Sequence, residues 1–443
     1  MKSVLTRRSF IAGASGFAAA LTSCGVFAAV ALAAPGQPPQ KPGEGGGPGG
    51  GLGGGPGGGD AGANTEPNAT VILQDGDALS GGTYTATEVD QSVFEASGNV
   101  TATLDGVSIQ KTAGNASSAD GSSFYGVNAA VRVYGDAHVT LKNCKVTAQA
   151  ENATGVFAYQ NGVIEIADST VEVTGGGAGG VQVSGGGTLY GSNLTVTSAS
   201  KAAIRSDRGG GILDLTGGTY TSTGTNGCPA IYSTADITVR DATCISEQSR
   251  AVIIEGKNSV TVENCELIAN DQSTKEDSLR ANVMLYQSMS GDASEGTSVF
   301  TMKKGSMRSE SGAMFYCTNT ACIVNLEEAE LTLSDDKSLL IISTGRWGKE
   351  GSNGGECAFI ATKQALEGSI TVDEISALSL RLTGSTYTGA INEGGHAGYV
   401  EVKLDESSTW TLLGDSYISD FSGDLANVKP NGFMLYINGE PAL

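Results

Sequence analysis

Short runs of alternating apolar and polar residues make up most of the chain from residue 68 to the C-terminus. In each run Val, Ile or Leu occupies every second position, and Thr, Lys, Glu or Arg stands between them. A period of two predicts strands that are buried on one face only. No long segment after residue 34 has the apolar spacing of a helix. The pattern therefore predicts an all-β protein.

The alternating runs belong to a larger unit that recurs at roughly 21–30 residues, the spacing of a solenoid. Units begin at Ala129, Gly155, Ala202, Pro229, Ala251 and Ala313. Each predicts a strand, a turn, a second strand, a turn at Asn, Asp or Gly, and a third strand. Such a unit buries its apolar side chains only against its neighbours, so the units stack in parallel. We expect a single-stranded right-handed parallel β-helix over residues 68–443, because parallel crossovers are almost always right-handed. The segment NGFMLYINGE from Asn431 is expected to cap it.

Chain length and charge support a stacked fold and restrict the partners. A chain of 443 residues exceeds the size at which one ordinary globular core stops growing, whereas a solenoid core grows along its axis. The formal net charge is -21, and residues 1–34 hold three basic residues and no acid, which gives -21 - 3 = -24 without them. This charge disfavours nucleic acid and anionic membranes, and it suits neutral sugars or divalent cations. An acidic polymer would need a local basic patch.

The N-terminal region predicts export. Residues 1–34 have the charged start, apolar stretch and small residues of a signal peptide, and Arg7-Arg8 followed by Ser-Phe-Ile is typical of a twin-arginine signal. Residues 35–67 are rich in Gly and Pro and predict a disordered tether. Simple cleavage is the first interpretation, with lipidation at Cys24 and an uncleaved anchor as alternatives. We expect an exported protein, extracellular or held at the cell surface through the tether.

Three irregular segments interrupt the repeat, at residues 271–280, 286–298 and 344–356. When the units are aligned at their first strands, several turns fall on one edge of the solenoid, over about 24 Å or five strand spacings. Loops on one edge of a repeat protein are where binding usually occurs. The polar and aromatic residues on that edge are Arg205, Asp207, Arg208, Tyr232, Asp236, Glu255, Lys257, Tyr286, Asp292, Glu295, Arg346, Trp347 and Lys349.

Two catalytic chemistries are open to this edge. Hydrolysis of a glycosidic bond needs an acid and a base, and Asp207 and Glu255 would lie about 9–10 Å apart, at the far limit for an inverting pair. Lyase chemistry needs a base beside a neutralised carboxylate. Its candidate basic residues are Arg205, Arg208 and Lys257. Its candidate calcium ligands are Asp207, Asp236 and Glu255.

Binding without catalysis needs only aromatic faces and polar groups around them. The candidate binding residues are Tyr232, Tyr286, Arg346, Trp347 and Lys349. A purely structural interpretation stands beside all three, because charges on solenoid turns often serve solubility and RSDRGGG could be an Arg–Asp turn clamp.

Histidine and cysteine residues suggest no further site. His138 and His396 are far apart in sequence, which argues against a histidine metal site or a Ser–His triad. Cys144, Cys244 and Cys265 align with Ser169 at the second turn and are expected to stack in the core. Cys317 and Cys322 are a candidate disulfide in an exported protein.

Several segments carry a resemblance to a known group of proteins. They are SSFYGVNAAV at Ser122, AAIRSDRGGG at Ala202, AIYSTADITV at Ala230, EGKNSVTVENC at Glu255, YQSMSGDASEGTS at Tyr286 and GRWGKEGSNGG at Gly345. With the Gly/Pro leader, they resemble exported β-helix proteins of anaerobic bacteria called adhesin-like or pectate-lyase-like. The resemblance implies the fold but no established activity, and no catalytic residue is carried over. Enzymes of the same fold imply lyase or hydrolase chemistry by analogy alone.

From these observations we expect an adhesin-like protein that binds carbohydrate or a host polymer through one edge. A polysaccharide lyase or glycoside hydrolase of the pectin-lyase-like fold is one alternative. A structural surface protein that self-associates is the other.

Overall fold

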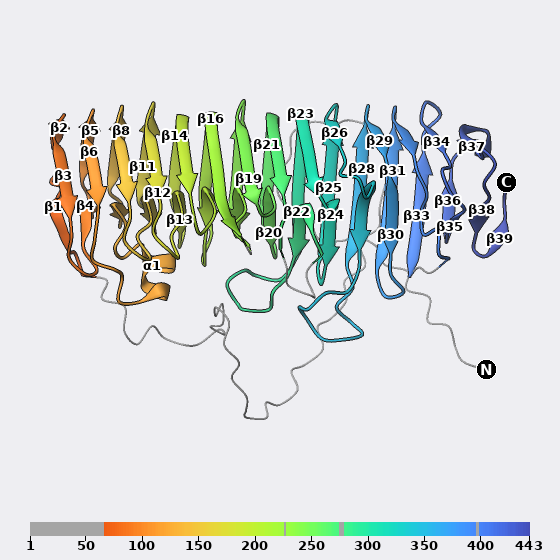
Figure 1. The fold of residues 1–443 in the computed structure, drawn as a ribbon, viewed down its shortest axis with the longest axis horizontal. Coiled ribbons are helices and arrows are strands. Elements are labelled where there is room, and N and C mark those ends of the chain that lie inside the picture. The colour runs from red at the N-terminus through yellow and green to blue at the C-terminus, as the bar shows by residue number, and fades with distance from the viewer. Residues whose placement is uncertain (1–65, 226, 274–278, 396–397) are drawn as a thin grey trace, which may run out of the picture. The chain divides into compact units, whose positions relative to one another are not determined.

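The computed structural model describes residues 66–225, 227–273, 279–395 and 398–443, all within one unit, Gly54–Leu443. The expected signal peptide, nearly all of the tether, Cys24 and His396 lie outside the described residues. Within them the chain is almost entirely β, with strands stacked in long parallel sheets as a solenoid (Figure 1). No helix in the described ranges is long and apolar enough to cross a membrane.

The described strands form four sheets. The first, sheet A, has the order β1 (Ala69–Ile72), β4 (Ser92–Ser97), β7 (Val131–Tyr134), β10 (Val156–Tyr159), β13 (Val181–Ser184), β15 (Ile204–Ser206), β17 (Ile231–Ser233), β20 (Val252–Glu255), β22 (Ala281–Tyr286), β24 (Ala313–Thr318), β27 (Ser338–Ile342) and β30 (Ser369–Val372). Sheet B consists of β2 (Ala78–Ser80), β3 (Thr83–Ala86), β5 (Thr101–Asp105), β6 (Ser108–Lys111), β8 (His138–Lys142), β9 (Lys145–Ala148), β11 (Val163–Ala167), β12 (Thr170–Val173), β14 (Gly187–Ser198), β16 (Gly211–Thr225), β18 (Asp236–Arg240), β19 (Thr243–Gln248), β21 (Ser259–Asn270), β23 (Thr297–Ser311), β25 (Ala321–Glu327), β26 (Glu330–Thr332), β28 (Glu356–Thr362), β31 (Ala377–Thr383), β33 (Tyr399–Leu404) and β36 (Asp420–Ser422). Sheet C is β29 (Ala365–Glu367), β32 (Thr386–Thr388), β34 (Thr409–Thr411) and β37 (Val428–Lys429), and sheet D is β35 (Ser416–Ile418), β38 (Leu435–Ile437) and β39 (Glu440–Pro441).

From β4 to β26, each coil of the solenoid contributes one strand to sheet A and one long strand or two strand segments to sheet B; toward the C-terminus the last segment of a coil belongs to sheet C instead. In one coil these are β10, β11 and β12, and each pairs in parallel with its equivalent in the next coil, β13 and the two halves of β14. The long strands β14, β16, β21 and β23 continue through the bend that separates the two segments in other coils. The expected parallel stacking of the units, with like position on like position, is therefore confirmed.

The core holds the inward residues of every coil. In β11 the burial alternates as the sequence predicts, with Ile164 and Ile166 buried and Glu165 exposed between them. One inward row of sheet A contains Val156, Val181 and Ile204 in adjacent strands. Each such side chain contributes about 1.5–3 kcal/mol when it leaves water, so the core gains stability coil by coil.

The bend between the two sheet B segments needs a residue with positive φ. Asn143, Asp168, Asn193 and Asn264 occupy it, with φ of 49–53°. Asn and Asp tolerate this conformation better than other residues with a side chain. Their side chains also bond from coil to coil, as when Asn193 Nδ2 donates to Asp168 Oδ1 over 3.1 Å. The Asn and Asp turns predicted from sequence thus form a ladder along one bend.

Three segments extend from the sheet A side of the solenoid. One carries α1 (Ala119–Tyr125), one follows β22, and one follows β27, and all lie on the same side of the coils (Figure 1). At the C-terminal end, β38 pairs in parallel with β35 and then antiparallel with β39, just after the single described 3-10 turn, η1 (Leu425–Asn427).

The cysteines are buried as expected, with one change of position. Cys144 and Ser169 share a slot, since the Cys144 amide donates to Ser169 Oγ over 2.9 Å. Cys244 does not share it: its register partners are Tyr220 and Leu267, two residues further along the strand and on the same buried face. The seven described cysteines are free thiols, with Cys317 and Cys322 Sγ atoms 3.0 Å apart.

Candidate functional site

Part of the candidate set lies together on the outer face of sheet A, where Arg205, Tyr232, Glu255 and Tyr286 come from strands and Asp207 and Trp347 from the turns beside them. Arg205, Tyr232 and Ile253 are register partners in β15, β17 and β20, and Met284 and Tyr316 continue the row in β22 and β24. A second outward row pairs Glu255 with Tyr286. The alignment of the repeat units predicted that Arg205 and Tyr232 lie in turns along one edge of the solenoid. In the structure they lie in strands, and their side chains point outward from sheet A.

Asp207 is held in a buried ion pair. The Arg205 guanidinium donates to both of its oxygens, from Nε to Oδ2 over 2.6 Å and from Nη2 to Oδ1 over 2.7 Å. Gln182, one coil earlier, donates to Oδ2 over 2.6 Å. Arg205 and Asp207 are each 4% exposed. The Arg–Asp clamp considered from the sequence is therefore confirmed, and it lies beneath the surface.

Glu255 accepts hydrogen bonds from three hydroxyl groups. Tyr232 and Tyr286 both donate to its Oε2, the latter over 2.9 Å, and Ser288 donates to Oε1. Glu255 is 2% exposed. Burial, followed by the nearby tyrosine and Glu255 charge, raises the pKa of Tyr232 well above its usual value, and burial with Glu255 also raises the pKa of Tyr286. Both phenols therefore stay protonated as donors to the carboxylate.

Trp347 closes this group from the loop after β27. Its ring packs on Tyr286 with centroids 4.7 Å apart, and the guanidinium of Arg346 lies 4.6 Å from the Trp347 ring centroid. Asn353 Nδ2 supports the loop by donating to the Gly345 and Trp347 carbonyls over 2.8 and 2.9 Å. Trp347 is half-buried and Arg346 is exposed. We call Arg205, Asp207, Tyr232, Glu255, Tyr286 and Trp347 the sheet A cluster.

Arg208 is not part of the cluster and instead connects two of the projecting segments. Its guanidinium lies 4.0 Å from the ring centroid of Phe124 in α1. It also donates to Asp292 in the segment after β22, over 2.8 Å from Nη2. Arg208 therefore bridges the two segments, although it lies 84 positions from Asp292 in sequence.

Other predicted site residues lie apart from the cluster. Asp236 is on sheet B, where it accepts from Ser259 Oγ over 2.7 Å. It therefore cannot share a calcium ion with Asp207 and Glu255 in this arrangement. Lys257 and Lys349 are exposed in turns. Among the described residues, no group of three or more His, Cys, Asp or Glu side chains is placed to hold a metal ion.

Two contributors to the cluster were missed in the sequence. Gln182 is the register partner of Arg205 in the preceding coil. The alignment of repeat units that identified Arg205 as a candidate could therefore have identified Gln182 as well. Ser288 lies in an irregular loop and has no such signal.

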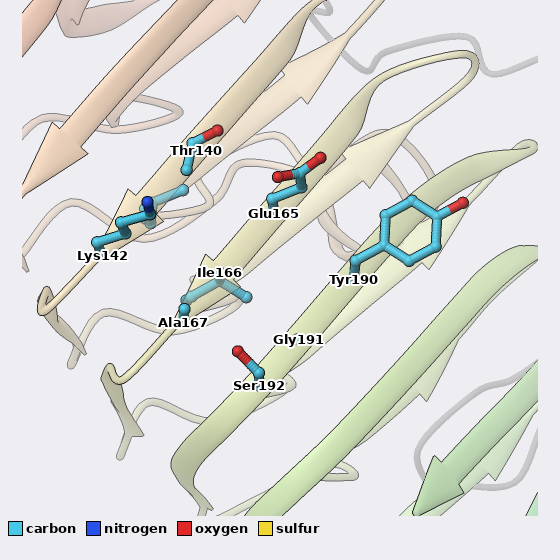
Figure 2. A pocket seen from close by; sticks show the side chains of 9 residues that line it. Thr140, Lys142, Glu165, Ile166, Ala167, Tyr190, Gly191 and Ser192 are labelled. Atoms are coloured by element: carbon cyan, nitrogen blue, oxygen red, sulfur yellow. The ribbon is translucent and has the colours of Figure 1, made fainter.

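A shallow hollow on the outer face of sheet B was also missed. Figure 2 shows its floor and rim, formed by side chains of β8, β11 and β14 that include Lys142, Glu165, Tyr190 and Ser192. Tyr190 is 46% exposed. The hollow crosses a regular sheet face and holds no buried polar group, so the sheet A cluster is the better candidate site.

Comparison of the chain with protein-family models, with curated proteins and with solved structures finds no match.

Proposed function

We propose that this protein is an exported, adhesin-like solenoid that binds carbohydrate or a host polymer at the loop-covered outer face of sheet A. The observation that carries the proposal is the packing of Trp347. Its half-buried ring is fixed against Tyr286 and lies beside the exposed Arg346 guanidinium. A rigid aromatic face with polar groups around it is the arrangement that orients a sugar ring in a binding site.

The same geometry favours binding over hydrolysis. A hydrolytic pair must flank the scissile bond with reachable oxygens. Asp207 and Glu255 are 4% and 2% exposed, and their oxygens already accept hydrogen bonds from neighbouring side chains. Arg205, a candidate lyase residue, is engaged by Asp207. The buried network therefore acts as a support for the aromatic surface.

Export and handedness complete the proposal. The signal-like residues 1–34 and the Gly/Pro-rich residues after them support transport and a tether at the cell surface. A right-handed coil is proposed from the general preference of parallel crossovers, and an experimental structure would test it. The likeness of the Gly/Pro leader and turn segments to adhesin-like proteins supports the same reading.

A glycan array tests the binding proposal. The protein with calcium present is expected to retain one class of glycan, and Trp347→Ala is expected to weaken that binding about tenfold or more, the effect of losing about 1.4 kcal/mol. Tyr399→Ala is the matched control, because Tyr399 is a 41% exposed aromatic on β33. No retained glycan, or equal weakening by both variants, would contradict the proposal.

A further inference from the structure

A lysine and a serine meet beneath α1, outside the sheet A cluster. Lys201 Nζ lies 2.6 Å from Ser123 Oγ, although the residues are 78 positions apart in sequence. Ser123 is on α1 and Lys201 is in the turn between β14 and β15. Ser123 is 8% exposed and Lys201 is half-buried, so the pair lies just beneath the surface.

Sheet A fixes the position of the serine. Gln182 Nε2 donates to the Ser123 carbonyl over 3.0 Å, and Ser184 Oγ donates to the Phe124 carbonyl over 2.8 Å. The helix begins with Ser118 Oγ accepting from the Gly121 amide over 3.0 Å. Outward side chains of β13 thus hold the end of α1, and they fix the serine hydroxyl against the lysine.

The surroundings of Lys201 lower the pKa of its amine. Burial, and then the nearby Arg205 charge, lowers the pKa of Lys201 to about 8. Asp207, Cys228 and Asp120 also face it and act in the opposite direction. At mildly alkaline pH a large fraction of Lys201 is therefore a neutral amine, which accepts a proton from the hydroxyl that it contacts.

We propose that Ser123 and Lys201 form a nucleophile–base pair that hydrolyses a carboxylic ester. Neutral Lys201 takes the proton of Ser123 Oγ as that oxygen attacks the carbonyl carbon of the ester. The carbon–oxygen bond to the alcohol then breaks, and Lys201 returns the proton to the leaving oxygen. Water, activated by the same amine, cleaves the acyl-serine and regenerates both side chains, so no oxidant or metal takes part. A serine activated by a lysine is an established arrangement for acyl transfer.

An ester is the favoured class of substrate over an amide. With Lys201 as the one proton donor to the leaving group, an alcohol leaves more readily than an amine. Lys201 is the group that contacts Ser123 Oγ among the described residues. The Ser123–Lys201 pair is independent of glycan binding, since the sheet A aromatic surface is formed by other residues.

Labelling of the full chain with a fluorophosphonate, followed by peptide mapping, tests the pair. Ser123 is expected to carry the label, with a rate that rises with pH through about 8 and then levels off. Ser123→Ala should remove the label. Lys201→Met should slow labelling about 100-fold or more, the usual contribution of a positioned base. Ser122→Ala is the matched control, because its hydroxyl bonds to the Asn152 carbonyl and not to Lys201.

Lys201→Arg separates catalysis from support. Arginine keeps a charged donor for Ser123 but cannot act as a base near neutral pH. A pair with only a structural role predicts unchanged labelling in Lys201→Arg, and that result would overturn the proposal. So would an unlabelled Ser123 in the unsubstituted protein at pH 9, under conditions that label a known serine esterase. Retained thermal stability with lost labelling would support it.

Discussion

Replacement of Asp207 by alanine tests whether the polar network of sheet A is a buried structural support. The substitution leaves the Arg205 charge, which is 4% exposed, without its two-oxygen partner. Breaking a buried pair from one side costs about 3–5 kcal/mol, because the remaining charge stays desolvated. Gln182 Nε2 loses an acceptor as well but keeps the Ser123 carbonyl, so its added cost is small. We expect Asp207→Ala to lower the free energy of unfolding by about 3–5 kcal/mol.

Urea unfolding followed by circular dichroism measures this loss, with tryptophan fluorescence as a second signal. A solenoid unfolds through neighbouring coils, so Trp347 reports the cluster and the fully buried Trp410 reports a region nearer the C-terminus. The double variant Arg205→Met with Asp207→Ala should recover more than half of the loss, because no unpaired charge remains. Asp214→Ala is the matched control. Its ion pair with Arg240 has side chains 38% and 39% exposed, so we expect a loss of about 0–1 kcal/mol.

Two outcomes would contradict a buried structural pair of Arg205 and Asp207. Equal losses in Asp207→Ala and Asp214→Ala would mean that the Arg205 pair is exposed to water in solution. A double variant as unstable as the sum of its two single variants would mean that the charges do not act on one another.

Three further predictions concern pH, thiols and the Trp347 loop. Because burial and Arg205 lower the pKa of Lys201 from 10.5 to about 8, the unfolded chain binds more protons between these values. The stability of the unsubstituted protein relative to Lys201→Met should therefore rise with pH above about 8; urea midpoints at pH 7.5 and 9.5 measure it, and a flat difference would contradict it. The seven described cysteines are buried thiols, so in protein that lacks residues 1–34, and with them Cys24, a colourimetric thiol reagent should titrate almost none before denaturation and seven after it. A count of five after denaturation would indicate a disulfide. Gly348 has φ of +79°, and an added Cβ would lie 2.2 Å from Asn319 Oδ1. The substitution Gly348→Ala should therefore displace the loop, shift the fluorescence emission of Trp347 to longer wavelength and weaken glycan binding. An unchanged emission spectrum would count against the loop geometry.

The alternation of apolar and polar residues was sufficient to predict the strands, because one face of every coil is buried against the core. Asn143, Asp168 and Asn193 likewise marked the bend that requires positive φ. The placement of Cys244 shows the limit of this method. Cys244 lies two residues beyond the slot of Cys144, on the same face of its strand, because the bend residue Asp241 precedes Cys244 by three positions whereas Asn143 directly precedes Cys144. Similar turns leave such a shift ambiguous until the strands are paired, since a period of two keeps the alternation intact.

The candidate site was predicted in composition but not in its contacts. Aligned units brought together Arg205 with Tyr232 and Glu255 with Tyr286, because equivalent positions in adjacent coils are neighbours by construction. The pairing of Arg208 with Asp292, and of Lys201 with Ser123, depends on where long irregular segments fold back. No periodicity governs those segments, so no alignment of units gives their contacts.

The order of residues along the chain was enough to predict the parallel solenoid, its inward rows and the turns that need Asn or Asp, since each depends on local spacing and on a repeat that stacks like on like. Which polar residues are buried partners and which remain exposed became clear only from the folded structure. Asp207 and Asp236 are both acidic residues at the end or start of a strand. Asp207 is buried and paired with Arg205 on sheet A, whereas Asp236 is exposed on sheet B. The difference arises because the α1 segment and the segments after β22 and β27 lie over one face of the coils. Whether a carboxylate loses its water depends on what packs over it and not on the residue type.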